Sequence, residues 1–186
     1  MSLVKIQGNA SGTGEFTIAA PNSNTNRTLT LPDNTGTIIT TASTNNYPTG
    51  PAFSAYKGSD QTVTSGVITK VTYDTEVFDT NSNFASSTFT PTVAGYYQVN
   101  ATICGAGSTT MTVLIGYIYK NGSSYRLGVL NAATGGNARY GISDLIYMNG
   151  TTDYLEIYAR VDGTGTMTFT GAATANSFSA VLVRAA

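Results

Sequence analysis

The sequence predicts an all-β protein, and three observations carry that prediction. Hydrophobic residues make up 41% of the 186 residues, but Thr, Ser, Asn and Gly interrupt them everywhere. No window keeps apolar residues at the three-and-four spacing of an amphipathic helix without Gly or β-branched clusters. Asn-Gly pairs, which are the strongest short hairpin signal, fall between apolar runs at Asn121-Gly122 and Asn149-Gly150. Short strands joined by turns are therefore expected throughout.

Residues 1–40 are expected to form a short β stem. Their apolar residues come as isolated pairs separated by turn sequences such as Pro32-Asp33-Asn34-Thr35-Gly36. So few apolar residues cannot form an independent core, so the stem is expected to pair with strands of other chains. The candidate docking residues are Phe16, Ile18, Leu29, Leu31 and Ile38. Residues 41–50, polar and punctuated by Pro48 and Gly50, are expected to be a linker.

Residues 51–186, called the knob below, are denser in Tyr, Phe, Val and Ile and are expected to form a two-sheet sandwich. The expected strands are Phe53–Tyr56, Val67–Tyr73, Thr88–Thr90, Tyr96–Cys104, Met111–Lys120, Ser123–Leu130, Ala138–Met148, Tyr154–Val161, Thr166–Thr170 and Phe178–Arg184.

Composition argues against several functions. A net charge of -1 with only 10% charged residues provides no basic surface for nucleic acid. No segment is long and apolar enough for a membrane helix, and the first nine residues lack the features of a secretion signal. The chain has no His, which removes the usual general base and the commonest metal ligand. Cys104 lies in an apolar run and is expected to be a buried, inert thiol.

The acidic residues suggest surface and turn positions rather than a catalytic or metal site. A glycosidase would need two carboxylates across a sugar cleft. Here Asp74, Glu76 and Asp79 fall around a strand end, Asp144 and Asp153 flank a hairpin, and the chain has no Trp to stack on a sugar. The spacing of Asp79, Asn81 and Asn83 imitates half of a calcium loop, but a plain turn is the better interpretation. Gly163-Thr164-Gly165 lacks the Lys and Ser/Thr of a phosphate loop. No cofactor is expected.

The knob also resembles the globular head domain of complement component one-q, whose fold is shared with the tumour necrosis factors. The family's pattern of aromatic, Asn or Asp, aromatic, Phe, Gly and Tyr positions is matched, in order, by Tyr73, Asp79, Phe84, Phe89, Gly95 and Tyr97. The sequence departs from the pattern in three ways: Tyr73 replaces a Phe, the gap between Phe84 and Phe89 is two residues short, and Val99 and Ala101 replace the last two aromatic residues. The resemblance implies a ten-stranded jelly roll that forms a homotrimer.

The stem resembles a segment common in tail-fibre and other virion proteins of bacteriophages. The similar residues run from Gly8 to Gly14 and from Pro21 to Thr37. This resemblance implies a virion-surface protein, made in the host cytoplasm and docked through its stem on the major capsid protein or a tail component.

Two virion roles follow, both without enzymatic activity. The first is a capsid decoration, or cement, protein, which is favoured because only about 50 residues precede the knob and leave no room for a fibre shaft. The alternative is a tail-fibre knob that binds a host surface glycan or protein. A glycan-degrading enzyme is a remote third possibility.

Overall fold

The computed structural model describes residues 11–14, 17, 19, 22–26, 28 and 50–186, with only the backbone for 129–135. The chain divides into two compact units, Met1–Ile38 and Ile39–Ala186. All five candidate docking residues of the stem, Phe16, Ile18, Leu29, Leu31 and Ile38, lie outside the described residues. The stem and linker boundaries therefore stay predictions, and the account below concerns the knob.

The described part of the knob is all-β, as predicted, and forms no helix. Accordingly, none of the described residues belongs to a helix able to cross a membrane. The strands are β1 (Ala52–Tyr56), β2 (Gln61–Val63), β3 (Thr69–Lys70), β4 (Thr75–Asp79), β5 (Phe84–Ala85), β6 (Thr88–Phe89), β7 (Gly95–Lys120), β8 (Ser123–Met148), β9 (Leu155–Thr164), β10 (Met167–Phe169) and β11 (Ser177–Ala185).

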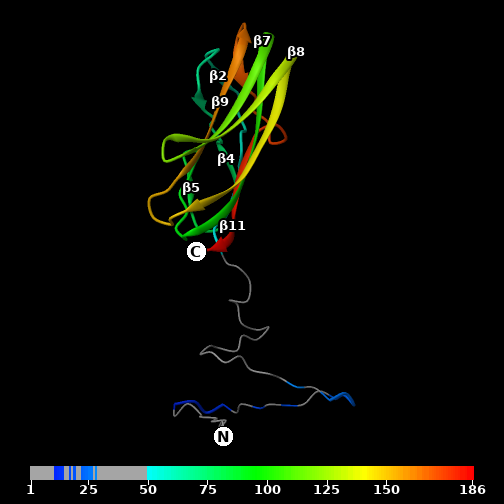
Figure 1. The fold of residues 1–186 in the computed structure, drawn as a ribbon, viewed down its shortest axis with the longest axis vertical. Helices are drawn as coiled ribbons and strands as arrows, with labels where there is room; N and C mark the ends of the chain where they lie inside the picture. Colours follow the sequence, from blue (N-terminus) through cyan, green and yellow to red (C-terminus); the bar gives the residue numbers. More distant parts are fainter. Residues whose placement is uncertain (1–10, 15–16, 18, 20–21, 27, 29–49) are drawn as a thin grey trace. The chain divides into compact units, whose positions relative to one another are not determined.

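Two long strands, β7 and β8, run side by side through the whole knob and belong to both layers of the sandwich (Figure 1). The first part of β7, Gly95–Thr102, pairs with β11, which continues through β1 to β4. Its last part, Thr110–Lys120, pairs with β9, which also pairs with β3 and β6. The segment between them, Gly105–Gly107, pairs with β10. β7 thus crosses from one layer to the other, which makes the fold a jelly-roll sandwich.

The strand predictions need three corrections. The separate strands expected at Tyr96–Cys104 and Met111–Lys120 are one strand, β7, and those at Ser123–Leu130 and Ala138–Met148 are likewise one strand, β8. Only Thr69–Lys70 of the expected strand Val67–Tyr73 joins the sheet, and Val67 and Ile68 are exposed residues that follow the turn at Ser65-Gly66.

Three short strands were not predicted: β2, β4 and β5. They are two to five residues long and lack a clear apolar alternation, so periodicity could not reveal them.

One predicted hairpin is confirmed and the other is wrong. Asn121 and Gly122 both have positive φ, 54° and 76°, and join β7 to its partner β8 in a tight turn. Asn149-Gly150 instead begins a longer connection, because β8 pairs with β7 and β9 lies on the other side of β7. The Asn149 side chain organises this connection by accepting hydrogen bonds from three successive backbone N–H groups, those of Thr151, Thr152 and Asp153.

The core contains an aromatic cluster that joins the two layers. Phe53 of β1 stacks on Phe84 and Phe89, with ring centroids 4.6 and 4.5 Å apart, and meets Phe178 of β11 edge to face at 4.8 Å. Offset and edge-to-face pairs of this kind add to the hydrophobic stabilisation of burial. The cluster therefore anchors β1 and β11 against β5 and β6.

Two buried tyrosines extend the cluster and differ in hydrogen bonding. The Tyr97 hydroxyl donates to the Val93 carbonyl at 2.7 Å, whereas the Tyr73 hydroxyl is buried without a partner in the described part of the chain. Burial raises the pKa of Tyr97 to about 12 and raises that of Tyr73 further. Tyr73 therefore carries an uncompensated cost of burial that a Phe would not.

A buried asparagine fills a gap in the hydrogen bonding along β7. Asn176, which is 0% exposed, precedes β11 at the point where the β7 ladder changes partner from β11 to β10. Its Oδ1 accepts from the Cys104 N–H at 2.7 Å, and its Nδ2 donates to the carbonyls of Cys104 and Thr170. The Thr170 N–H already donates to the Cys104 carbonyl at 3.1 Å, and the side chain supplies the partners that the Cys104 N–H and the Thr170 carbonyl would otherwise lack. Cys104 is a buried free thiol.

Candidate functional site

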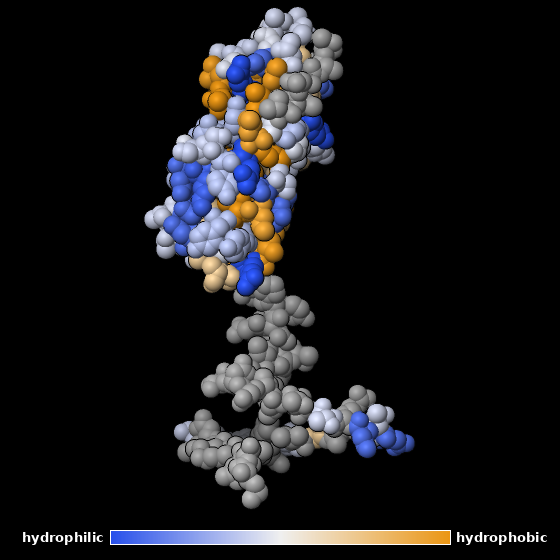
Figure 2. All heavy atoms as spheres, viewed as in Figure 1, coloured by the Kyte–Doolittle hydropathy of each residue, from blue (hydrophilic) through white to orange (hydrophobic). Residues whose placement is uncertain are grey.

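The outer face of the layer formed by β11, β7 and β8 carries an unusual group of apolar side chains. We define the apolar patch as Tyr96 of β7, Leu145 and Tyr147 of β8, and Val181 and Val183 of β11. These side chains are 42–58% exposed. Figure 2 shows hydrophobic residues reaching the surface of the knob in a lengthwise band. A cluster of this kind marks an interaction surface more often than isolated exposed residues do.

Strand register places the patch residues together. Val181 lies opposite Gln98, which lies opposite Leu145, and Tyr96 lies opposite Tyr147 with ring centroids 5.5 Å apart. A hollow of about 320 Å³ opens between Tyr96, Leu145, Val183 and Arg184. The patch is therefore one continuous surface, with a depression that a side chain of another molecule can enter.

The same strands are apolar on their inner face as well. Tyr97, Ile146 and Leu182 alternate with the patch residues and pack inward, where Tyr97 and Ile146 are fully buried. The sequence signal for the patch is this lack of alternation: Tyr96-Tyr97, Leu145-Ile146-Tyr147 and Val181-Leu182-Val183 are runs of consecutive apolar residues within strands. Such runs indicate that both faces of a strand are covered.

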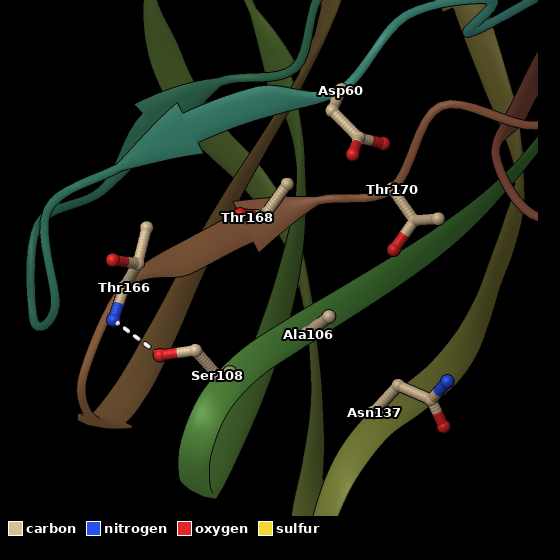
Figure 3. A pocket seen from close by; sticks show the side chains of 8 residues that line it. Asp60, Ala106, Ser108, Asn137, Thr166, Thr168 and Thr170 are labelled. Atoms are coloured by element: carbon tan, nitrogen blue, oxygen red, sulfur yellow. Dashed lines mark hydrogen bonds between the residues drawn. The ribbon is translucent and has the colours of Figure 1, made fainter.

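Further along β7, the surface changes to hydroxyl and amide groups and forms a second candidate site. We define the polar groove as a depression of about 410 Å³ lined by Asp60, Ala106, Gly107, Ser108, Asn137, Thr166, Thr168 and Thr170. Figure 3 shows that these residues lie on several strands and the segments next to them, around the small Ala106 side chain. Sequence reasoning did not single out any of them as a ligand-binding site, since they come together only through strand register.

The structure places the residues of the family pattern in two environments. Tyr73, Phe84, Phe89, Gly95 and Tyr97 are buried, and Gly95 is required because any side chain there would collide with the Arg184 carbonyl of β11. Asp79 is not in the core. Its Oδ2 accepts from the Phe84 N–H at 2.6 Å and its Oδ1 from the Asn81 N–H at 3.3 Å, so it closes the turn between β4 and β5.

Several acidic side chains near strand ends and turns have structural partners. Hydrogen bonding from the Gly58 N–H lowers the pKa of Asp74. Burial alone would raise the pKa of Asp153, but hydrogen bonds from Asn121 and Lys120 and the Lys120 charge lower it. Asp144 pairs with Arg126, and Glu156 with Lys70 at 2.7 Å. Asn81 and Asn83 form side-chain hydrogen bonds within the turn that Asp79 closes. These groups are therefore engaged in holding turns and strands.

No protein-family model matches the sequence, and no curated protein matches it. Solved structures do match the fold. The globular domain of zebrafish complement 1qA aligns with a TM-score of 0.55 at 15% identity, over 73% of this chain and 99% of that one. Murine APRIL aligns with a TM-score of 0.56 at 6% identity, over 72% and 99%. Eiger TNF from S. frugiperda aligns with a TM-score of 0.53 at 9% identity, over 74% and 93%.

Together, the crossing of β7 between two layers and these alignments show that the knob has the jelly-roll fold of the complement 1q and tumour necrosis factor globular domains.

Proposed function

We propose that this chain is a non-enzymatic structural protein of a bacteriophage virion, in which three knobs associate through the apolar patch and the stem docks on the capsid as a decoration protein. The observation that supports association is that Tyr96, Leu145 and Val181 are exposed on a layer whose inner face is already packed. Burying these side chains against a second copy removes apolar surface from water. Each Å² of apolar surface buried stabilises the association by about 25 cal/mol.

The virion assignment rests on the stem sequence. The segments from Gly8 to Gly14 and from Pro21 to Thr37 resemble those of phage tail-fibre and other virion proteins. In this role Phe16, Ile18, Leu29, Leu31 and Ile38 contact the major capsid protein. The trimer then bridges neighbouring shell subunits and stabilises the shell against internal pressure without chemistry.

Labelling of intact particles tests the location. Antibodies against the knob, coupled to gold, should spread evenly over the heads in electron micrographs of a phage that encodes this chain. Particles stripped of the protein should also lose DNA at a lower temperature than intact ones. Gold confined to the tail, or stripped heads with unchanged thermal release of DNA, would contradict the decoration role.

The second candidate is a tail-fibre knob that binds the host surface, and the polar groove favours it. A concave site with hydroxyl and amide groups on rigid strands is suited to recognition and has no evident part in holding a shell together. In that role, soluble full-length protein should slow adsorption of the phage to its host, and label should cluster at the tail. Unchanged adsorption at saturating protein would count against it.

A further inference from the structure

The floor and walls of the polar groove are fixed by strand pairing. Thr168 of β10 lies opposite Ala106 of β7 on one side and Thr62 of β2 on the other, and Ala106 lies opposite Asn137 of β8. These residues form a row across four neighbouring strands. Ala106 is the smallest member of that row, so the surface is hollow between Asn137 and Thr168 (Figure 3).

Backbone pairing also fixes the mouth of the groove. Ser108 and Thr166 exchange two hydrogen bonds of 3.0 Å, one from the Ser108 N–H to the Thr166 carbonyl and one from the Thr166 N–H to the Ser108 hydroxyl. At the other end, Oδ1 of Asp60 accepts from the Gly171 N–H at 2.6 Å. The site is therefore pre-organised, which lowers the ordering cost of binding.

Several polar groups of the groove are left unused. The Asn137 amide and the hydroxyls of Thr166, Thr168 and Thr170 make no hydrogen bond with any group that the structure describes. They offer donors and acceptors side by side, because a hydroxyl does both and an amide provides one of each. A ligand rich in hydroxyl groups can satisfy them in pairs.

The charge of the lining residues narrows the class of ligand that the polar groove can bind. Asp60 is the only charged residue among the described residues lining the groove, and no Lys or Arg is among them. A sulfate, phosphate or sialic acid would meet no cation among the lining residues and would lie near a carboxylate, which disfavours anions. A neutral sugar avoids this repulsion, and a carboxylate oxygen is a good acceptor for sugar hydroxyls.

We propose that the polar groove binds a neutral carbohydrate, with Asn137, Thr168 and Thr170 hydrogen bonding to its hydroxyl groups and Asp60 accepting from another. The inference rests on the second candidate function above, a tail-fibre knob that binds the host surface, and deepens it by naming the ligand class. It is compatible with association through the apolar patch. Ala106 lies ten residues beyond Tyr96 along β7, which is about 33 Å at about 3.3 Å per residue, so the groove lies well away from the patch.

Saturation-transfer NMR on the full-length chain tests this directly. The probes are the methyl glycosides of glucose, galactose, mannose and N-acetylglucosamine, with the methyl glycoside of sialic acid as the acidic comparison. At least one neutral glycoside should receive saturation from the protein, and the sialoside should receive none. Binding by no neutral glycoside, or stronger binding by the sialoside, overturns the proposal.

Two variants locate the binding. Thr168→Val keeps the shape and strand preference of the side chain while removing its hydroxyl, and Asn137→Ala removes an amide with no partner in the described protein. Each loses about one hydrogen bond, so the double variant should bind roughly thirtyfold more weakly. The matched controls are Thr90→Val and Asn100→Ala, which are exposed positions outside the groove. Equal weakening by the control pair overturns the assignment to the groove.

The same variants in the adsorption experiment separate this inference from the broader role. If wild-type protein slows adsorption and the Thr168→Val/Asn137→Ala variant does so equally well, the chain recognises the host but not through the groove. If wild-type protein neither slows adsorption nor binds a neutral glycoside, both the receptor-binding role and the groove assignment are wrong.

Discussion

The layer formed by β11, β7 and β8 is apolar on both faces at one end, yet only its inner face is covered. On the inner face, Tyr97 and Ile146 are fully buried against the opposite layer. On the outer face, their neighbours Tyr96 and Leu145 are 44% and 50% exposed. An antiparallel sheet with one wet face normally alternates apolar and polar residues. The contrast indicates that the inner face stabilises the fold, and it is the reason for proposing that association completes the outer face.

The comparison of the two faces predicts that truncating an aromatic side chain of the inner face lowers the stability of the protein most. Phe53→Ala removes the ring that contacts Phe84, Phe89 and Phe178, and should lower the free energy of unfolding by about 3–5 kcal/mol. Denaturant titration at one fixed protein concentration measures it. The control is Phe78→Ala, because Phe78 is 48% exposed and its loss should cost less than about 1 kcal/mol. Equal losses in the two variants would break the distinction between the faces.

A smaller loss is expected where a side chain completes the backbone pairing of β7. Asn176→Ala leaves the Cys104 N–H and the Thr170 carbonyl without their partner, which should cost about 2–3 kcal/mol. The same titration, with Asn100→Ala as an exposed control on β7, measures the difference. A loss below about 0.5 kcal/mol would mean that water replaces the Asn176 side chain.

Some features of the fold were predictable from the sequence and others were not. The turn at Asn121-Gly122 was predictable, since both residues tolerate the positive φ that the turn requires. The same pair of residue types at Asn149-Gly150 failed as a hairpin signal, because local turn chemistry does not specify which strands become neighbours. The continuity of β7 across both layers was missed because Gly105 and Gly107 interrupt its apolar pattern while still pairing with β10.

The two candidate sites were unequally visible in the sequence. Consecutive apolar residues such as Val181-Leu182-Val183 indicate a strand covered on both sides, so the apolar patch has a local signal. The polar groove has none. Ala106, Asn137 and Thr168 are ordinary residues in sequence, and only the register of β7 with β8 and β10 places them in one row.

The smallest expected change in stability comes from the hydroxyl groups of the two buried tyrosines, only one of which has a hydrogen-bond partner in the described part of the chain. Tyr73→Phe removes a buried hydroxyl with no partner in the described part of the chain and should raise the free energy of unfolding by about 1 kcal/mol. Tyr97→Phe removes the hydrogen bond to the Val93 carbonyl and should lower it by about 1 kcal/mol. Thermal unfolding of the two variants at matched concentration measures both. Shifts in the same direction would show that hydrogen bonding does not distinguish the two tyrosines.

The measurement that tests the central claim most directly is the mass of the full-length protein in solution, by light scattering at micromolar concentration. Association as a trimer predicts about 58 kDa, three times the 19.3 kDa of one chain. Leu145→Glu with Val183→Glu, which places charges in the apolar patch, should reduce the mass to that of a monomer. Leu127→Glu, at an exposed position outside the patch, should leave the trimer intact. A wild-type mass near 19.3 kDa, or a patch variant that remains trimeric, would contradict the account.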